Sequence, residues 1–73
     1  MREFEILIED IDPCGGEQFA RRSIVEVQAE SPEVYVQENG RYPVVEQRVN
    51  AAGDTVIVTA NNCGYMIRYT FSE

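Results

Sequence analysis

Alternation of hydrophobic and polar residues runs through several segments of the chain and predicts β-strands. In the first segment, residues 2–9, apolar side chains occupy one face and carboxylates the other, with Leu7 as the exception. The apolar positions are Phe4, Ile6 and Ile8, and the acidic positions are Glu3, Glu5 and Glu9. A strand with this pattern is expected to bury its apolar face and leave its glutamates in solvent.

Four further segments read as strands. They are residues 23–29, 43–50, 55–60 and 65–72, all rich in β-branched or aromatic residues. In the last of them, Tyr65, Ile67, Tyr69 and Phe71 share one face, which predicts that they pack in the core. Residues 51–54 and 61–64 contain Gly, Asn and Asp and read as tight hairpin turns.

One short helix is predicted between the second and third strands. Ser31 is suited to the N-cap, Pro32 to the first helical position and Glu33 to the positive end of the helix dipole. Asn39 and Gly40 are expected to end the helix in a left-handed C-cap. A helix of about two turns is not stable alone and has to pack on a sheet.

The predicted order is therefore β-β-α-β-β-β, an α+β fold with a single, mostly antiparallel five-stranded sheet and one short helix on one face. If the helix spans the sheet, the third strand runs opposite to the first, and Cys14 and Cys63 lie at the same end of the sheet. If it does not, the third strand runs parallel to the first and the two cysteines separate. The pattern of residues leaves both directions open.

Composition narrows the class of protein. Of the 73 residues 44% are hydrophobic, too many for a disordered chain, so residues 1–73 are predicted to form a single small globular domain. The net charge of −7 disfavours nucleic acid and anionic membranes as partners. No apolar run approaches the ~20 residues of a membrane span, and no secretion signal follows Met1. We expect a bacterial, cytoplasmic protein.

The two cysteines are the residues with the most distinctive chemistry. Cys14 and Cys63 each stand in a Gly-containing turn, Pro-Cys-Gly-Gly and Asn-Asn-Cys-Gly. A disulfide would close a loop of about 50 residues and contribute roughly 3–4 kcal/mol, but cytosolic thiols are kept reduced. Zinc would need two carboxylates as well, or four thiolates shared across a dimer. Acidic neighbours disfavour a reactive thiolate. Two ordinary reduced thiols, with no metal or cofactor, are the simplest reading.

A second candidate site is the connection predicted between the first two strands, residues 10–22. It offers Phe19 as an aromatic anchor and Arg21 with Arg22 as adjacent cations in an acidic chain. The alternative is that Phe19 covers the core beneath a loop.

The residues favour a binding role over catalysis. The chain has no histidine, which excludes His-based dyads and triads, and a domain of this size has little room for a substrate pocket. We expect a small acidic, non-enzymatic protein-interaction or regulatory module that binds another protein as a monomer or homodimer, through a sheet edge or the 10–22 segment. The alternative is a thiol- or metal-dependent function of Cys14 and Cys63.

Overall fold

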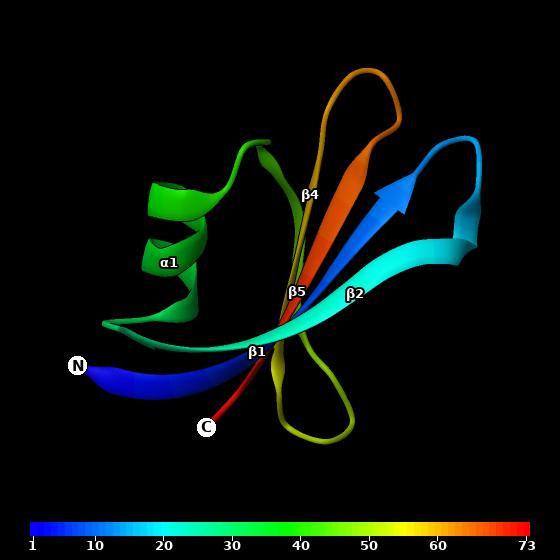
Figure 1. Cartoon of the computed structure of the whole chain (residues 1–73). Helices are drawn as coiled ribbons and strands as arrows, with labels where there is room; N and C mark the ends of the chain where they lie inside the picture. Colours follow the sequence, from blue (N-terminus) through cyan, green and yellow to red (C-terminus); the bar gives the residue numbers. More distant parts are fainter.

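The chain folds into a five-stranded antiparallel sheet with one helix across one face (Figure 1). The structure, a computed structural model, describes the backbone of residues 1–73 and all side chains except those of residues 16, 17 and 19. Its elements are β1 (Arg2–Asp12), β2 (Gly16–Ala29), α1 (Pro32–Asn39), β3 (Val44–Val49), β4 (Thr55–Ala60) and β5 (Met66–Ser72). The predicted α+β class and the predicted order of elements are both confirmed.

The strands lie side by side in the order β2-β1-β5-β4-β3, and every neighbouring pair is antiparallel. The first and last strands of the chain therefore pair at the centre of the sheet, while β2 and β3 form its two edges. The chain passes from one edge to the other through α1. As a result β3 runs opposite to β1, which resolves the direction that the sequence left open.

The core lies between α1 and the face of the sheet that the helix covers. Aromatic rings dominate it: Phe4 and Phe71 meet edge to face at 5.6 Å between centroids, and Tyr35 of the helix packs on Phe71 at 5.8 Å. Ile6 and Ile57 are fully or almost fully buried beside them. The alternation predicted for β1 and β5 therefore places the expected residues inside, because one face of each strand meets the helix.

Tyr65 departs from that alternation. The residue was predicted to continue the inner face of the last strand, but β5 begins at Met66 and Tyr65 is 39% exposed. Asn61 holds Tyr65 in the turn, since the Tyr65 N–H donates to the Asn61 side chain at 3.0 Å. The turn thus removes Tyr65 from the core.

The helix begins as the sequence predicts and ends differently. Ser31 Oγ accepts the Val34 N–H at 3.2 Å, and Pro32 occupies the first turn. The C-cap Gly40, however, has φ −75° and ψ 145°, an extended rather than a left-handed conformation. Glycine is needed there for another reason, because a Cβ at Gly40 would lie 2.5 Å from the Val36 carbonyl oxygen.

The first hairpin is longer than the sequence predicts. Residues 16–22, expected as part of a loop, belong to β2, and β1 continues to Asp12, so the connecting turn spans only residues 13–15. Cross-strand pairs such as Asp10 with Arg21 explain the extension, because opposite charges directly across an antiparallel pair stabilise it.

The face of the sheet away from the helix holds an ionic cluster around one buried carboxylate, and this carboxylate corrects a second expectation. Glu9, predicted to be solvated, is only 6% exposed. Its carboxylate accepts hydrogen bonds from Arg68 Nε at 2.8 Å and Arg22 Nε at 3.0 Å. Register is the cause, since Arg68 and Arg22 stand directly opposite Glu9 on β5 and β2. The carboxylate thereby links three strands.

These contacts generate a prediction about acid stability. The Arg68 hydrogen bond, and then that of Arg22, lowers the pKa of Glu9 against the opposing effect of burial. The resulting stabilisation of the folded state is fully present above the pKa of Glu9 in the unfolded chain, about 4.3. It is lost as the pH falls through the lower pKa that Glu9 has in the folded protein. Glu9→Gln is expected to reduce the free energy of unfolding by about 2 kcal/mol at pH 7 and by much less at pH 3, measured by urea denaturation.

Glu3→Gln is the matched control, because Glu3 lies on the same strand, is exposed and accepts only a 3.4 Å amide contact from Gln28. It should change stability little at either pH. A Glu9→Gln deficit that is equally large at pH 7 and pH 3 would show that packing rather than charge is responsible.

Candidate functional site

The two cysteines occupy turns built in the same way. In the β1–β2 turn the Cys14 N–H donates to Asp12 Oδ1 at 2.8 Å, and in the β4–β5 turn the Cys63 N–H donates to Asn61 Oδ1 at 2.9 Å. In each case an Asp or Asn side chain two residues earlier fixes the cysteine backbone, a typical Asx-turn. Both thiols are free and exposed.

The two turns touch. Gly64 has φ +91°, and a Cβ built there would lie 3.0 Å from Pro13 Cβ, so the backbone of one turn packs against the ring of the other. Cys63 precedes Gly64 and Cys14 follows Pro13, which places both thiols at one end of the sheet, as the alternating strand directions predict. We call the two turns, residues 13–15 and 61–64, together with the α1–β3 loop, residues 40–43, the turn end.

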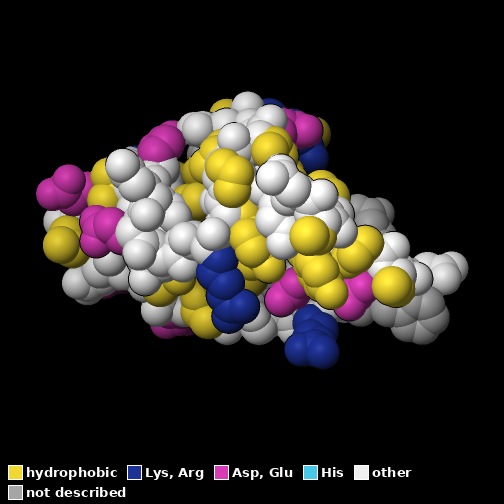
Figure 2. Space-filling view, turned by 90° about the horizontal axis from the view of Figure 1, so that it is seen from above, with side chains coloured by type: hydrophobic (Ala, Val, Ile, Leu, Met, Phe, Trp, Pro, Cys, Tyr) yellow, Lys and Arg dark blue, Asp and Glu magenta, His cyan; other side chains and the backbone are white. Residues whose placement is uncertain are grey.

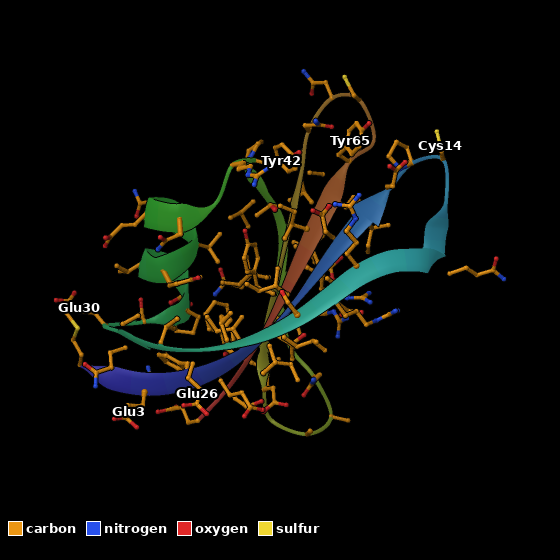
Figure 3. The ribbon with its side chains drawn as sticks, viewed as in Figure 1. Glu3, Cys14, Glu26, Glu30, Tyr42 and Tyr65 are labelled. Carbon is orange, nitrogen blue, oxygen red and sulfur yellow. The ribbon has the colours of Figure 1, made fainter. Side chains whose placement is uncertain are left out.

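A hollow of about 460 Å³ opens beside Cys14 at the turn end. Figure 3 shows Cys14, Tyr42 and Tyr65 at this end, whereas Glu3, Glu26 and Glu30 lie at the other. The hollow is lined by side chains of mixed charge, and Figure 2, which looks onto this end, shows acidic, basic and hydrophobic side chains side by side. The charged lining residues are Asp10, Asp12, Arg21 and Arg41.

Charge balance limits what the hollow can bind. Two carboxylates and two guanidinium groups cancel, so neither an anion nor a cation is favoured overall. Among the described residues, no group of three or more Cys, Asp or Glu side chains is arranged to hold a metal ion. The turn end therefore presents two exposed thiols on hydrogen-bonded turns, next to a polar surface without a dominant charge.

The opposite end carries a larger hollow of about 510 Å³. Its charged lining is entirely acidic, and Glu5 stands directly opposite Glu26 across β1 and β2. Like charges in that position are destabilising. Because every charged residue that lines this hollow is a carboxylate and the lining contains no thiol, it is a weaker candidate than the turn end in spite of its size.

The structure separates the residues of the second predicted site. Arg21 lines the hollow at the turn end, whereas Arg22 projects from the other face of β2 toward Glu9. Successive residues of a strand point to opposite faces, so the two arginines do not form a joint basic patch. Phe19 lies outside the described side chains. A partner site on Phe19, Arg21 and Arg22 thus stays a prediction, now on a strand and not on a loop.

Sequence reasoning missed the most exposed element of the fold. All six residues of the edge strand β3 are exposed, and its three valines, Val44, Val45 and Val49, are 51%, 59% and 67% exposed. Apolar residues of this kind normally point into a core. Pro43 before the strand and the charged Glu46 and Arg48 within it are features typical of an edge strand, and they are the local signal that could have shown the difference.

A groove of about 400 Å³ lies between β3 and the helix. Buried Val36 and Ile57 contribute to its lining, and half-exposed Val44 contributes from the edge strand. At one end the Gln47 side-chain amide donates to Glu33 on α1. The groove gives the β3 edge an apolar recess beside it.

Comparison with protein-family models, curated proteins and solved structures finds no match to this chain. Over the described residues, no helix is both long enough and apolar enough to cross a bilayer. Functional inference therefore depends on the turn end and the β3 edge themselves.

The contact between the two turns generates a second prediction. Gly64→Ala is expected to lower the free energy of unfolding by about 2 kcal/mol, because it adds both a strained positive φ and a clash with Pro13. Gly53→Ala is the matched control, since Gly53 has a similar φ of +86° but no atom within 4 Å of its Cβ position.

The two variants are compared by urea denaturation. Gly53→Ala should cost about 1 kcal/mol, the backbone contribution alone. If both variants lose the same amount, the Pro13 contact does not hold the two turns together.

Proposed function

We propose that this chain is a small, non-enzymatic protein-interaction module that binds an extended strand of another chain along the β3 edge. The proposal is based on the exposure of every residue of β3, including three valines, in a strand that pairs with β4 on one side and lies at the edge of the sheet on the other. An edge strand offers a row of backbone N–H and C=O groups that a further strand can pair with. This mode of recognition is common among peptide-binding domains.

The two edges of the sheet differ in a way that favours β3. The described exposed residues of β2 are mostly charged or polar, and charge is how native sheets protect an edge. Ile24 is the one large apolar residue among them that is more than half exposed. On β3 three exposed valines flank one ion pair, Arg48 Nε to Glu46 Oε2 at 2.8 Å. An added strand would therefore cover more exposed apolar surface at β3 than along the described residues of β2.

The groove supplies specificity to such an interaction. Side chains of an added strand alternate between the two faces of the sheet, and those on the helix side would enter the recess lined by Val36, Val44 and Ile57. Those on the other side would face Glu46 and Arg48. The expected ligand is therefore an extended segment with apolar residues on one face and charges of both signs on the other.

Selection from a displayed library of random peptides tests the proposal. Peptides enriched on the wild-type protein are expected to alternate apolar and charged residues and to bind Val49→Lys about tenfold more weakly, because lysine protects an edge. Ile24→Lys on β2 is the control and should leave binding unchanged. Affinities are measured by isothermal titration calorimetry. Peptides that lose affinity for Ile24→Lys instead would place the site on the other edge.

A thiol-dependent function at the turn end is the second candidate, supported by the matched Asx-turns and the Pro13–Gly64 contact. The corresponding reaction joins Cys14 and Cys63 in a disulfide, while oxidised glutathione as the oxidant is reduced to two molecules of glutathione. Each protein molecule would lose two hydrogens.

Intact mass after incubation with oxidised glutathione checks this reaction. A direct disulfide is expected to need both cysteines, so Cys14→Ser and Cys63→Ser should abolish it equally and leave a glutathione adduct on the remaining thiol. Formation of two adducts on the wild-type protein, without a bridge, would end this candidate.

A further inference from the structure

We propose that β3 pairs with β3 of a second copy of this chain, in one antiparallel register that the charges of the strand select. The proposal rests on the proposed function, because it names a partner for the same edge. Its basis is the sequence Val45-Glu46-Gln47-Arg48-Val49, in which the residues on the two sides of Gln47 match when the charges are exchanged.

The sheet register determines which of these side chains share a face. Gln47 stands opposite Ile57 on the face covered by the helix, while Glu46 and Arg48 stand opposite Val58 and Val56 on the other face. Glu46 and Arg48 are therefore neighbours on one face, about half exposed, and already form an ion pair. Their charged groups are accessible to an added strand.

Symmetry restricts the ways in which two copies of β3 can pair. Two identical antiparallel strands side by side are related by a two-fold axis perpendicular to the sheet, and residues that stand opposite each other lie on the same face. Within the regular stretch, residues 46–49, the axis could pass through Glu46, Gln47, Arg48 or Val49. An axis at Val49, the last residue of β3, would leave almost the whole strand unpaired, so three registers remain. An axis between two residues would set side chains that point to opposite faces of the sheet opposite each other.

Charge decides among the three registers. An axis at Glu46 sets the two Glu46 carboxylates of the dimer opposite each other, and an axis at Arg48 sets its two guanidinium groups opposite each other. Both arrangements are destabilising because the charges are alike. An axis at Gln47 sets Glu46 of each copy opposite Arg48 of the other. Together with the ion pair within each strand, the four charges then alternate in sign around a square. This charge complementarity identifies a second copy as the occupant of the edge.

The ends of the same register are apolar. Val49 of one copy comes near Val45 of the other, which lies in the bulge before Glu46, and these are the two most exposed valines of the chain, at 67% and 59%. A bulge between Val44 and Glu46 bends the strand there. The pairing between the two copies therefore ends at these valines. Each chain carries a net charge of −7, so association requires this local complementarity to outweigh a general repulsion.

A charge-swap cycle measured by sedimentation equilibrium tests the proposal. The wild-type protein is expected to dimerise reversibly. Glu46→Arg and Arg48→Glu should each raise the dissociation constant by about tenfold or more, because each variant replaces both opposite-charge pairs by like-charge pairs. The double variant, Glu46→Arg with Arg48→Glu, should recover the wild-type constant to within about threefold. Because the double variant also restores the ion pair within each strand, the position-specific cross-link described next is needed to show that the pairing between copies is responsible.

Glu26→Arg is the matched control for Glu46→Arg, since it makes the same change in net charge on β2 and should leave dimerisation no weaker. Circular dichroism establishes that each variant is folded. A position-specific test uses the Cys14→Ser, Cys63→Ser background. There, Gln47→Cys on the two-fold axis should give a covalent dimer on oxidation with copper phenanthroline, whereas Arg21→Cys on β2 should not.

The outcomes separate this inference from the proposed function. A wild-type chain that is monomeric at every concentration overturns self-pairing, and the proposed function still stands if selected peptides bind the β3 edge. Dimerisation that the double variant does not restore, or that Gln47→Cys does not trap, also overturns self-pairing. Loss of dimerisation in both single variants, recovery in the double variant and trapping of the dimer through Gln47→Cys together support it.

Discussion

The pairing of the first strand with the last is the constraint on which the rest of the structure depends. Because β5 pairs antiparallel with β1, the β1–β2 hairpin and the three strands β3, β4 and β5 form one continuous sheet. The same pairing sets Arg68 opposite Glu9 and Phe71 opposite Ile6. It therefore creates both the ionic cluster on one face and the centre of the aromatic core on the other. It also carries the two cysteine turns to one end, where Gly64 meets Pro13.

Much of this fold is encoded locally and was predictable from the sequence. Alternation identified the first, second and last strands, and β-branched content identified the segments that form β3 and β4. Ser31 and Pro32 marked the start of the helix, because capping chemistry depends only on adjacent residues. Counting connections placed Cys14 and Cys63 together only on the condition that the helix spans the sheet, and the structure meets that condition. These inferences need no knowledge of which strands become neighbours.

The features that could not be predicted from the sequence depend on which strands become neighbours in the sheet. Glu9 resembles Glu3 and Glu5 in its local pattern, and only the residues opposite it on β2 and β5 make it a buried ion. Val49 resembles a core valine, yet its strand lies at the outer edge of the sheet. The extension of the first hairpin through Arg21 likewise depends on cross-strand charges. In each case a contact distant in sequence decides the environment of a residue whose local pattern is ordinary.

The central position of β1 and β5 has a consequence for the order of folding. The β1–β2 hairpin and the β3–β4–β5 meander each consist of strands that are close in sequence, so each half can form from local contacts. The two halves join only where residues 5–11 meet residues 66–72, which closes a loop comprising most of the chain. Long-range closure of this kind is the slow event in small β-rich proteins. Folding kinetics of this chain are therefore governed by its central seam, and substitutions there are expected to slow folding more than those at either edge.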